Sequence, residues 1–184
     1  MKLKLTFILA VLCSLMSAGC MNHSSISTNL PLYHSVKIRE AVLSAEYLID
    51  DGENERVKLH NGTFEKAIVP GSASKIRATL GSTSSIADIN NDNIEDAVVT
   101  LRVNYGGSGT FSYLALLLNE VDNMNNVDTV FLGDRIIVKS IRISTNFITV
   151  TLLKRKKSEP MSTLPSIEKK LKFELQENQL IKLK

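Results

Sequence analysis

The stretch 88–96 carries oxygen-bearing side chains at a spacing that suits a hard cation. Asp88, Asn90, Asp92 and Asp96 occupy loop positions one, three, five and nine, and Ile94 would add its backbone carbonyl. Calcium takes roughly six to eight oxygen ligands, and side chains at alternate positions of a curled loop converge on one point. These five residues therefore predict a Ca²⁺ site.

The same stretch also fits a turn that needs no ion. Asn93 stands where calcium loops usually carry glycine, and Val99 stands where a helix-loop-helix calcium site has its bidentate glutamate. With fewer ligands, the expected affinity for calcium is weak. Because Asn and Asp side chains also bond the backbone of their own turn, a calcium loop and a self-closed turn both fit.

A second chemical feature is the cationic run Lys154, Arg155, Lys156 and Lys157. One interpretation is a solvated hairpin end that discourages edge-to-edge strand pairing. The other is contact with anionic headgroups or lipopolysaccharide phosphates of the membrane that anchors the chain. Both interpretations place these four side chains in solvent.

Groups for hydrolytic or redox catalysis do not stand out. The three histidines, His23, His34 and His60, have no metal-ligand or catalytic neighbours in sequence, and serine-hydrolase and zinc-protease motifs are missing. We therefore expect a non-enzymatic protein. The alternatives are an envelope glycan or peptidoglycan hydrolase using a pair of carboxylates from Asp92, Asp96 and Asp134, and a lysozyme-inhibitor-like protein.

The amino-acid composition argues against two classes of binding partner, nucleic acids and stacked sugars. The net charge of +3 includes Lys2 and Lys4, so the remainder is too balanced to predict nucleic acid as a partner. The chain has no tryptophan and only 5% aromatic residues, which gives little sign of a platform for stacking sugars.

The elements that must position these residues are mainly strands. Apolar residues alternate with polar ones, as in Ile148, Val150 and Leu152, and turn signals such as Asn61-Gly62 separate the runs. This pattern predicts an antiparallel meander that forms a β-sandwich or a barrel-like wrap. The expected strands cover 44–49, 55–60, 63–68, 74–80, 84–88, 96–104, 111–119, 127–132, 135–144, 147–154, 167–175 and 179–183.

Two segments of the body depart from simple alternation. The run 111–118 is apolar at consecutive positions, which predicts a strand buried on both faces. The segment 35–47 places Ile38, Val42 and Ala45 at helical spacing behind Ser35, a potential N-cap. One short N-terminal helix and a strand both fit this segment.

The N-terminus has the three parts of an export signal. Lys2 and Lys4 precede the 12-residue apolar run Leu5–Met16, which is shorter than the roughly 20 residues needed to span a bilayer, and small residues lead to Cys20. We expect a signal peptide over 1–19, a flexible tether over 20–34 and a single β-rich domain over 35–184.

The stretch Met16-Ser17-Ala18-Gly19-Cys20 resembles the lipobox of bacterial lipoproteins, although Ser17 stands where leucine is commonest. The resemblance implies a lipid on Cys20 and, with Met21 following, sorting to the outer membrane, facing the periplasm or the cell surface. The alternative is an ordinary secretory signal cut near Ala18, which would leave Cys20 as an odd thiol.

A wider resemblance covers roughly residues 43–183. The acidic loop 88–96, the turn Gly106-Gly107-Ser108-Gly109 and the segment Leu132-Gly133-Asp134-Arg135 resemble a family of small bacterial lipoproteins of unassigned function. The resemblance supports the β-rich fold and carries no activity. The expected protein is a lipid-anchored envelope lipoprotein whose domain, with calcium as a candidate stabiliser, binds an envelope protein or polymer.

Overall fold

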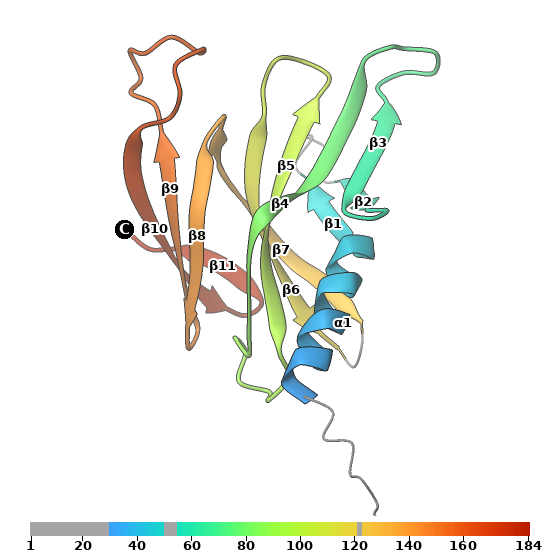
Figure 1. The fold of residues 1–184 in the computed structure, drawn as a ribbon, viewed down its shortest axis with the longest axis vertical. Helices are drawn as coiled ribbons and strands as arrows, with labels where there is room; N and C mark the ends of the chain where they lie inside the picture. Colours follow the sequence, from blue (N-terminus) through green and yellow to red (C-terminus); the bar gives the residue numbers. More distant parts are fainter. Residues whose placement is uncertain (1–29, 50–54, 121–122) are drawn as a thin grey trace, which may run out of the picture.

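The computed structural model describes residues 30–49, 55–120 and 123–184 (Figure 1). The fold is mainly β, with antiparallel sheets and one helix, which confirms the predicted class. Its elements are α1 (Leu30–Ser44), β1 (Glu46–Ile49), β2 (Glu55–Lys58), β3 (Thr63–Ala67), β4 (Lys75–Ala87), β5 (Asp96–Tyr105), β6 (Phe111–Asn119), β7 (Met124–Asp134), β8 (Ile137–Ser144), β9 (Phe147–Lys154), β10 (Ile167–Gln176) and β11 (Gln179–Lys182).

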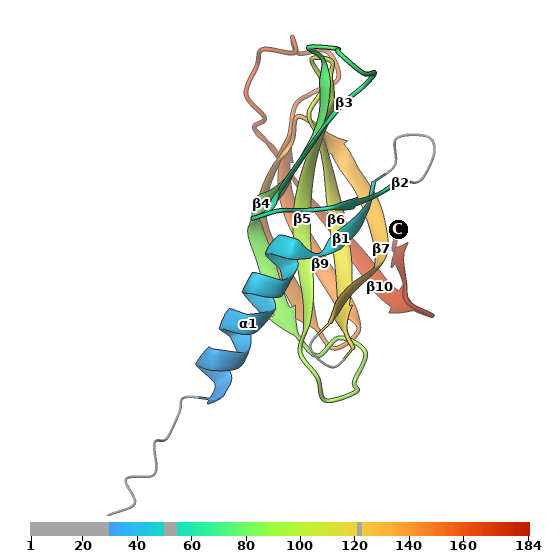
Figure 2. The ribbon, with the colours of Figure 1, turned by 90° about the vertical axis from the view of Figure 1, so that its right-hand side faces the viewer.

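The elements form three layers around a five-stranded central sheet, ordered β3-β4-β5-β6-β7. A four-stranded sheet, β11-β10-β9-β8, packs against one face of it. Helix α1 and the β1–β2 hairpin cover the other face (Figure 2). Within the described residues the sheets do not join into one closed barrel, so the arrangement is a sandwich with an added layer.

Strand β6 lies in the middle of this stack and contributes to both hydrophobic cores. Leu114 and Leu116 pack toward the four-stranded sheet, whereas Ala115 and Leu117 pack toward α1 and the β1–β2 hairpin. Successive side chains of a strand point to opposite faces, so a strand covered on both faces has to be apolar throughout. The central position predicted for 111–118 is confirmed.

Helix α1 resolves the ambiguous N-terminal segment and starts earlier than expected. It begins at Leu30, inside the stretch predicted as a tether, so Ser35 lies within the helix and does not cap it. Pro31 is compatible with the first helical turn, where no intrahelical partner is available for its missing N–H. Ile38 and Val42, four residues apart, bury the same face of the helix. Among the described residues, no helix has the length and apolar character needed to cross a membrane.

Strand β4 joins two segments that the sequence pattern separates. The predicted strands 74–80 and 84–88 form one strand, with an irregularity between Leu80 and Ser84. A Cβ atom at Gly81 would lie 2.1 Å from the Thr100 hydroxyl oxygen, so the close approach requires glycine. The hydroxyl of Thr83 then donates to the carbonyl of Val138 on β8 (3.3 Å), which links the two sheets along this side.

The pairing of β7 with β6 is irregular at two places, and one of them, between Leu116 and Leu117, lies at Asn126, which attaches the β1–β2 hairpin. Asn126 is 1% exposed, and its Oδ1 accepts the backbone N–H of Leu48 on β1 (2.8 Å). Its Nδ2 donates to the carbonyls of Leu116 (2.9 Å) and Asp128 (2.8 Å). The buried amide is therefore fully paired, and it fixes β1 beside β7.

Asp128, two residues further along β7, attaches the four-stranded sheet. Its Oδ2 accepts the backbone N–H of Leu180 on β11 (2.7 Å), and its Oδ1 accepts the N–H of Thr129 (2.8 Å). The short segment 126–128 is thus bonded to strands of all three sheets.

Asn126→Ala should destabilise the fold by about 2–4 kcal/mol, because it leaves the Leu48 N–H and two buried carbonyls without a side-chain partner. Urea unfolding measures the loss. Asn125→Ala is the matched control, since among the described residues the Asn125 side chain bonds Glu120 alone, in an exposed position. Equal losses for both variants would contradict a special role for Asn126.

Candidate functional site

The strand register gathers the sequence motifs at two opposite ends of the domain. The connections β3–β4, β5–β6, β7–β8 and β9–β10 lie at one end, here called the basic end (Figure 1). The β4–β5 loop, which contains the predicted calcium residues, lies at the other end with the beginning of α1. The two candidate sites are therefore separate.

The β4–β5 loop is closed by its own side chains. The Asp88 carboxylate accepts the N–H groups of Asp92 (3.2 Å) and Asn93 (3.0 Å). Asn90 Oδ1 also accepts the Asp92 N–H (3.1 Å), and Asp92 Oδ1 accepts that of Ile94 (2.8 Å). Asn93 adopts a positive φ of 68°, as its place in the loop requires. These are the bonds of the self-closed turn.

The calcium interpretation of this loop stays a prediction. Among the described residues, no three His, Cys, Asp or Glu side chains are grouped so that they could hold a metal ion. Ile94 is half-buried, and Asp96 is turned into the protein interior. Calorimetry with Ca²⁺ on the wild type and on Asp92→Ala tests the prediction.

Asp96, the first residue of β5, differs from the acidic residues of the preceding loop because it is fully buried. Its two oxygens accept the backbone N–H groups of Ile89 (3.1 Å) and Asn119 (3.0 Å). Burial raises the pKa of Asp96, the two N–H groups oppose the rise, and the carboxylates of Asp92 and Asp88 add to it. Asp96 therefore ties the loop to the end of β6.

The cationic run at the basic end lines a pocket of about 640 Å³. Its apolar walls come from both sheets of the sandwich, and its rim combines the run with lysines of neighbouring strands. The apolar residues are Leu132, Ile136, Leu152, Leu171 and Met161, and the basic ones are Lys154, Arg155, Lys156, Lys157, Lys169 and Lys182. A space of this size is within the usual range for ligand sites.

Sequence reasoning missed Lys169 and Lys182 as parts of this site. Lys169 pairs with the buried Leu152, and Lys182 pairs with the buried Phe173, so both lysines stand on the inner face of the four-stranded sheet. Lys154 likewise continues the inward row of alternate β9 residues. The sequence signal that could have identified them is a lysine that falls on the same alternation as the buried residues of its strand.

Two carboxylates also line the pocket, and both are engaged by neighbours. Asp134 accepts the backbone N–H of Thr110 (3.0 Å) and pairs with Arg135 (3.4 Å). Glu159 accepts the backbone N–H of Lys156 (2.8 Å). The pocket is therefore strongly cationic in balance.

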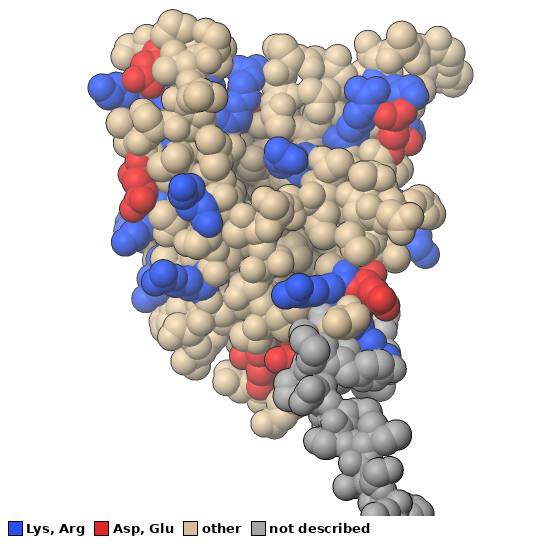
Figure 3. Space-filling model, viewed as in Figure 1, with Lys and Arg blue, Asp and Glu red and all other residues tan. Residues whose placement is uncertain are grey.

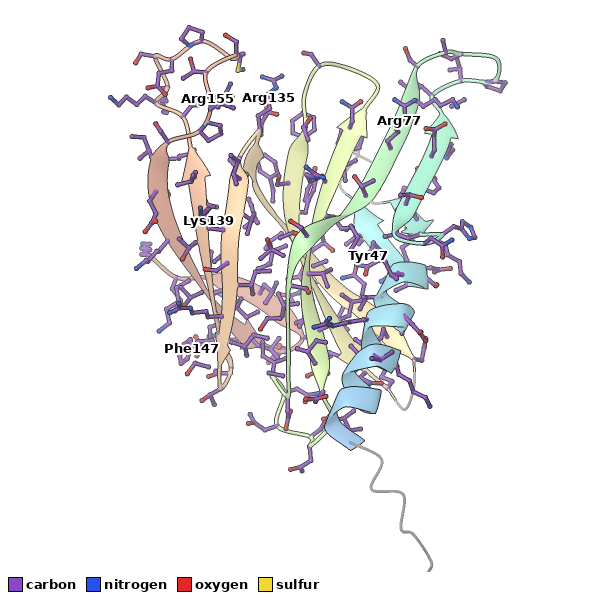
Figure 4. All side chains as sticks on the ribbon, in the orientation of Figure 1. Tyr47, Arg77, Arg135, Lys139, Phe147 and Arg155 are labelled. Carbon is purple, nitrogen blue, oxygen red and sulfur yellow. The ribbon has the colours of Figure 1, made fainter. Side chains whose placement is uncertain are left out.

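Arg135 holds the loops of the basic end together. Its guanidinium donates twice to the carbonyl of Ser108 (3.2 Å from Nε, 3.0 Å from Nη2) and once to the sulfur of Met161. Arg155 donates to the Met161 carbonyl, and Figure 4 shows both arginines at this end. The Gly-rich turn and the Leu-Gly-Asp-Arg segment thus meet beside the cationic loop.

The three carboxylates considered for hydrolysis are not brought together. Asp134 adjoins Arg135 at the basic end, whereas Asp92, in the β4–β5 loop, and Asp96, the first residue of β5, lie at the other end (Figures 1 and 4). A glycosidase pair requires carboxyl groups within about 10 Å of one another. Asp134 therefore has no partner among the other two.

Comparison with protein-family models, with curated proteins and with solved structures gave no match for this chain. The resemblance to a lipoprotein family stays a prediction from sequence motifs. Cys20 and the expected signal lie outside the described residues.

Stability should depend on pH through Asp96. Since folding raises its pKa, this carboxyl stabilises the fold increasingly as the pH falls through the raised value, and the gain is complete below the ordinary 3.8. The unfolding free energy of the wild type relative to Asp96→Asn should therefore grow from neutral to acid pH in urea titrations. Asp92→Asn controls for the loss of a charge in the same loop. A difference that does not vary with pH would contradict the assignment.

Proposed function

We propose that this chain is a lipoprotein of the bacterial envelope, lipidated at Cys20, whose β-domain is a non-enzymatic binding module. The pocket of the basic end is its binding site, and it takes anionic groups carried by an envelope polymer or protein. The observation that carries the proposal is the convergence of six cationic side chains over an apolar floor.

Charge and packing both support an anionic ligand. Within the described residues, none of the ion pairs involves Lys154, Lys156, Lys157 or Lys169. Like charges around one pocket repel each other, and a bound phosphate or carboxylate relieves this repulsion. The four strands that line the pocket, β7, β9, β10 and β11, also contribute to the hydrophobic core, so its walls are built on rigid elements, and the β9–β10 connection adds the cations 155–157.

The anchor is supported by the sequence motif at residues 16–20 and by the arrangement of the chain. Helix α1 begins at Leu30, so the nine residues 21–29 separate its start from Cys20. The pocket lies at the end of the domain remote from that start (Figure 1). If a lipid on Cys20 anchors the chain, the domain faces the periplasm or the cell surface and its pocket stays accessible.

The anchor has a direct test in cells. Metabolically supplied palmitate should label the wild-type chain and leave Cys20→Ser unlabelled, because acylation requires that sulfur. Label incorporation is measured on the immunoprecipitated protein. Equal labelling of both chains, or of neither, would contradict the lipidation proposal.

The pocket can be tested with a defined polyanion. Calorimetry should show that polyphosphate binds the full chain, and Lys154→Glu with Lys169→Glu should weaken binding by at least about tenfold, since both lysines point into the pocket. Lys170→Glu is the matched control, because Lys170 lies on the outer face of β10. Equal weakening by the control would show a general charge effect, and unchanged binding in the double variant would refute the pocket assignment.

A further inference from the structure

Two projecting loops of the basic end carry exposed apolar side chains. Ile68 (46% exposed) and Val69 (58%) lie in the β3–β4 connection, and Met161 (65%) and Leu164 (80%) lie in the β9–β10 connection. In Figure 3 both tips are mostly uncharged, although the left-hand tip carries an acidic group, and Lys and Arg lie beneath them. Under the β3–β4 tip, Lys75 and Arg77 are paired with Glu65, so among the described residues of this end the cations without an ion pair lie on the side of the β9–β10 tip. Single exposed apolar residues are ordinary, whereas four on two tips above cations form a pattern.

The tips have a definite shape of their own. Ile68 donates its N–H to the Ser74 carbonyl (3.1 Å), and the N–H of Ser72 bonds the carbonyl of Val69 (3.0 Å). A Cβ atom at Gly106 would lie 2.3 Å from Ile68 Cδ1, so this loop packs closely on the β5–β6 turn. Binding by such loops loses little conformational entropy.

The β9–β10 connection is similarly held. Thr163 donates its N–H to the Pro160 carbonyl (3.0 Å), and Ser166 donates to Lys154 (3.2 Å). These turns keep Met161 and Leu164 outside the core. Lys156 and Lys157 are exposed in the same connection, close to its tip.

The combination of apolar tips and cations favours an anionic bilayer over an acidic polymer as the partner. An acidic polymer would be held by the cations alone and would leave the apolar tips in water. A bilayer with anionic headgroups offers both phosphates for the cations and an apolar region for the tips. The charge and the exposure of these loops therefore complement a lipid surface.

We propose that the basic end docks on an anionic lipid surface, with the tips Ile68–Val69 and Met161–Leu164 entering the headgroup region. The cations of the pocket then contact lipid phosphates. This inference rests on the anion-binding pocket proposed above and replaces the polymer or protein with a lipid surface as the source of the anions. The chain enters the domain from the end that faces away from the docked surface (Figure 1). The docked surface is thus on the far side of the domain from the proposed anchor.

The chain has no tryptophan, so a single introduced tryptophan reports on one position. The experiment uses the full chain carrying Leu164→Trp, reconstituted through its N-terminal end in phosphatidylcholine vesicles. Adding vesicles that contain about a third of phosphatidylglycerol should shift the emission to shorter wavelength, because the indole enters an apolar region. Vesicles of phosphatidylcholine alone should cause no shift.

Val36→Trp is the matched control, because Val36 on α1 is 45% exposed and lies at the opposite end. It should show no shift with either vesicle. In the Leu164→Trp chain, Lys156→Glu with Lys157→Glu should raise the lipid concentration needed for half of the shift by more than about tenfold. Lys170→Glu should leave it unchanged.

Three outcomes would overturn the docking proposal. They are no shift for Leu164→Trp, the same shift with uncharged vesicles, and an equal shift for Val36→Trp. Polyphosphate binding that depends on Lys169 without any lipid-induced shift would retain the anion pocket and refute the lipid surface as its partner. If neither polyphosphate binding nor the lipid-induced shift is observed, the proposed pocket is refuted as well.

Discussion

The short segment of β7 around Asn126 and Asp128 is the constraint on which the other parts depend. Hydrophobic burial presses the three layers together without specifying how they are turned relative to one another. The hydrogen bonds of Asn126 to β1 and of Asp128 to β11 fix the orientation of the outer layers relative to the central sheet. Because an unpaired buried amide is costly, the observed placement of these strands is favoured over placements that break these bonds.

The pocket follows from this placement. Strand β7 continues from the junction to Leu132 and Asp134, which form one wall of the pocket opposite β9 and β10. On the facing sheet, the inward rows change from leucine to lysine at Lys154 and Lys169. Lysine ammonium groups retain water, so the two sheets cannot close there as they do around Leu114 and Val150. The inward-facing positions of these strands are therefore apolar within the core and cationic where the pocket begins.

The two ends of the domain differ in chemistry and in position. The end beside the start of α1 carries the acidic β4–β5 loop, in which the carboxylates of Asp88 and Asp92 accept backbone N–H groups. The other end carries cations over apolar walls and exposed apolar tips. A protein that is anchored near one end and cationic at the other is suited to binding an anionic partner at a distance from its anchor. This polarity connects the proposed anchor with the proposed binding face.

Much of this protein was determined by local sequence. Alternation located the strands, consecutive apolar residues placed β6 at the centre, and Asn and Asp predicted the turn at 88–96, because each of these patterns depends only on neighbours along the chain. The packing of Ile38 and Val42 on the central sheet, the continuous β4 and the burial of Asp96 depended on contacts with distant segments. Only the tertiary structure placed Lys169 and Lys182 beside the run at 154–157. The reason is physical: alternation along a strand shows which residues share a face with Lys169 or Lys182, but only strand pairing and the packing of the two sheets decide which loop that face meets.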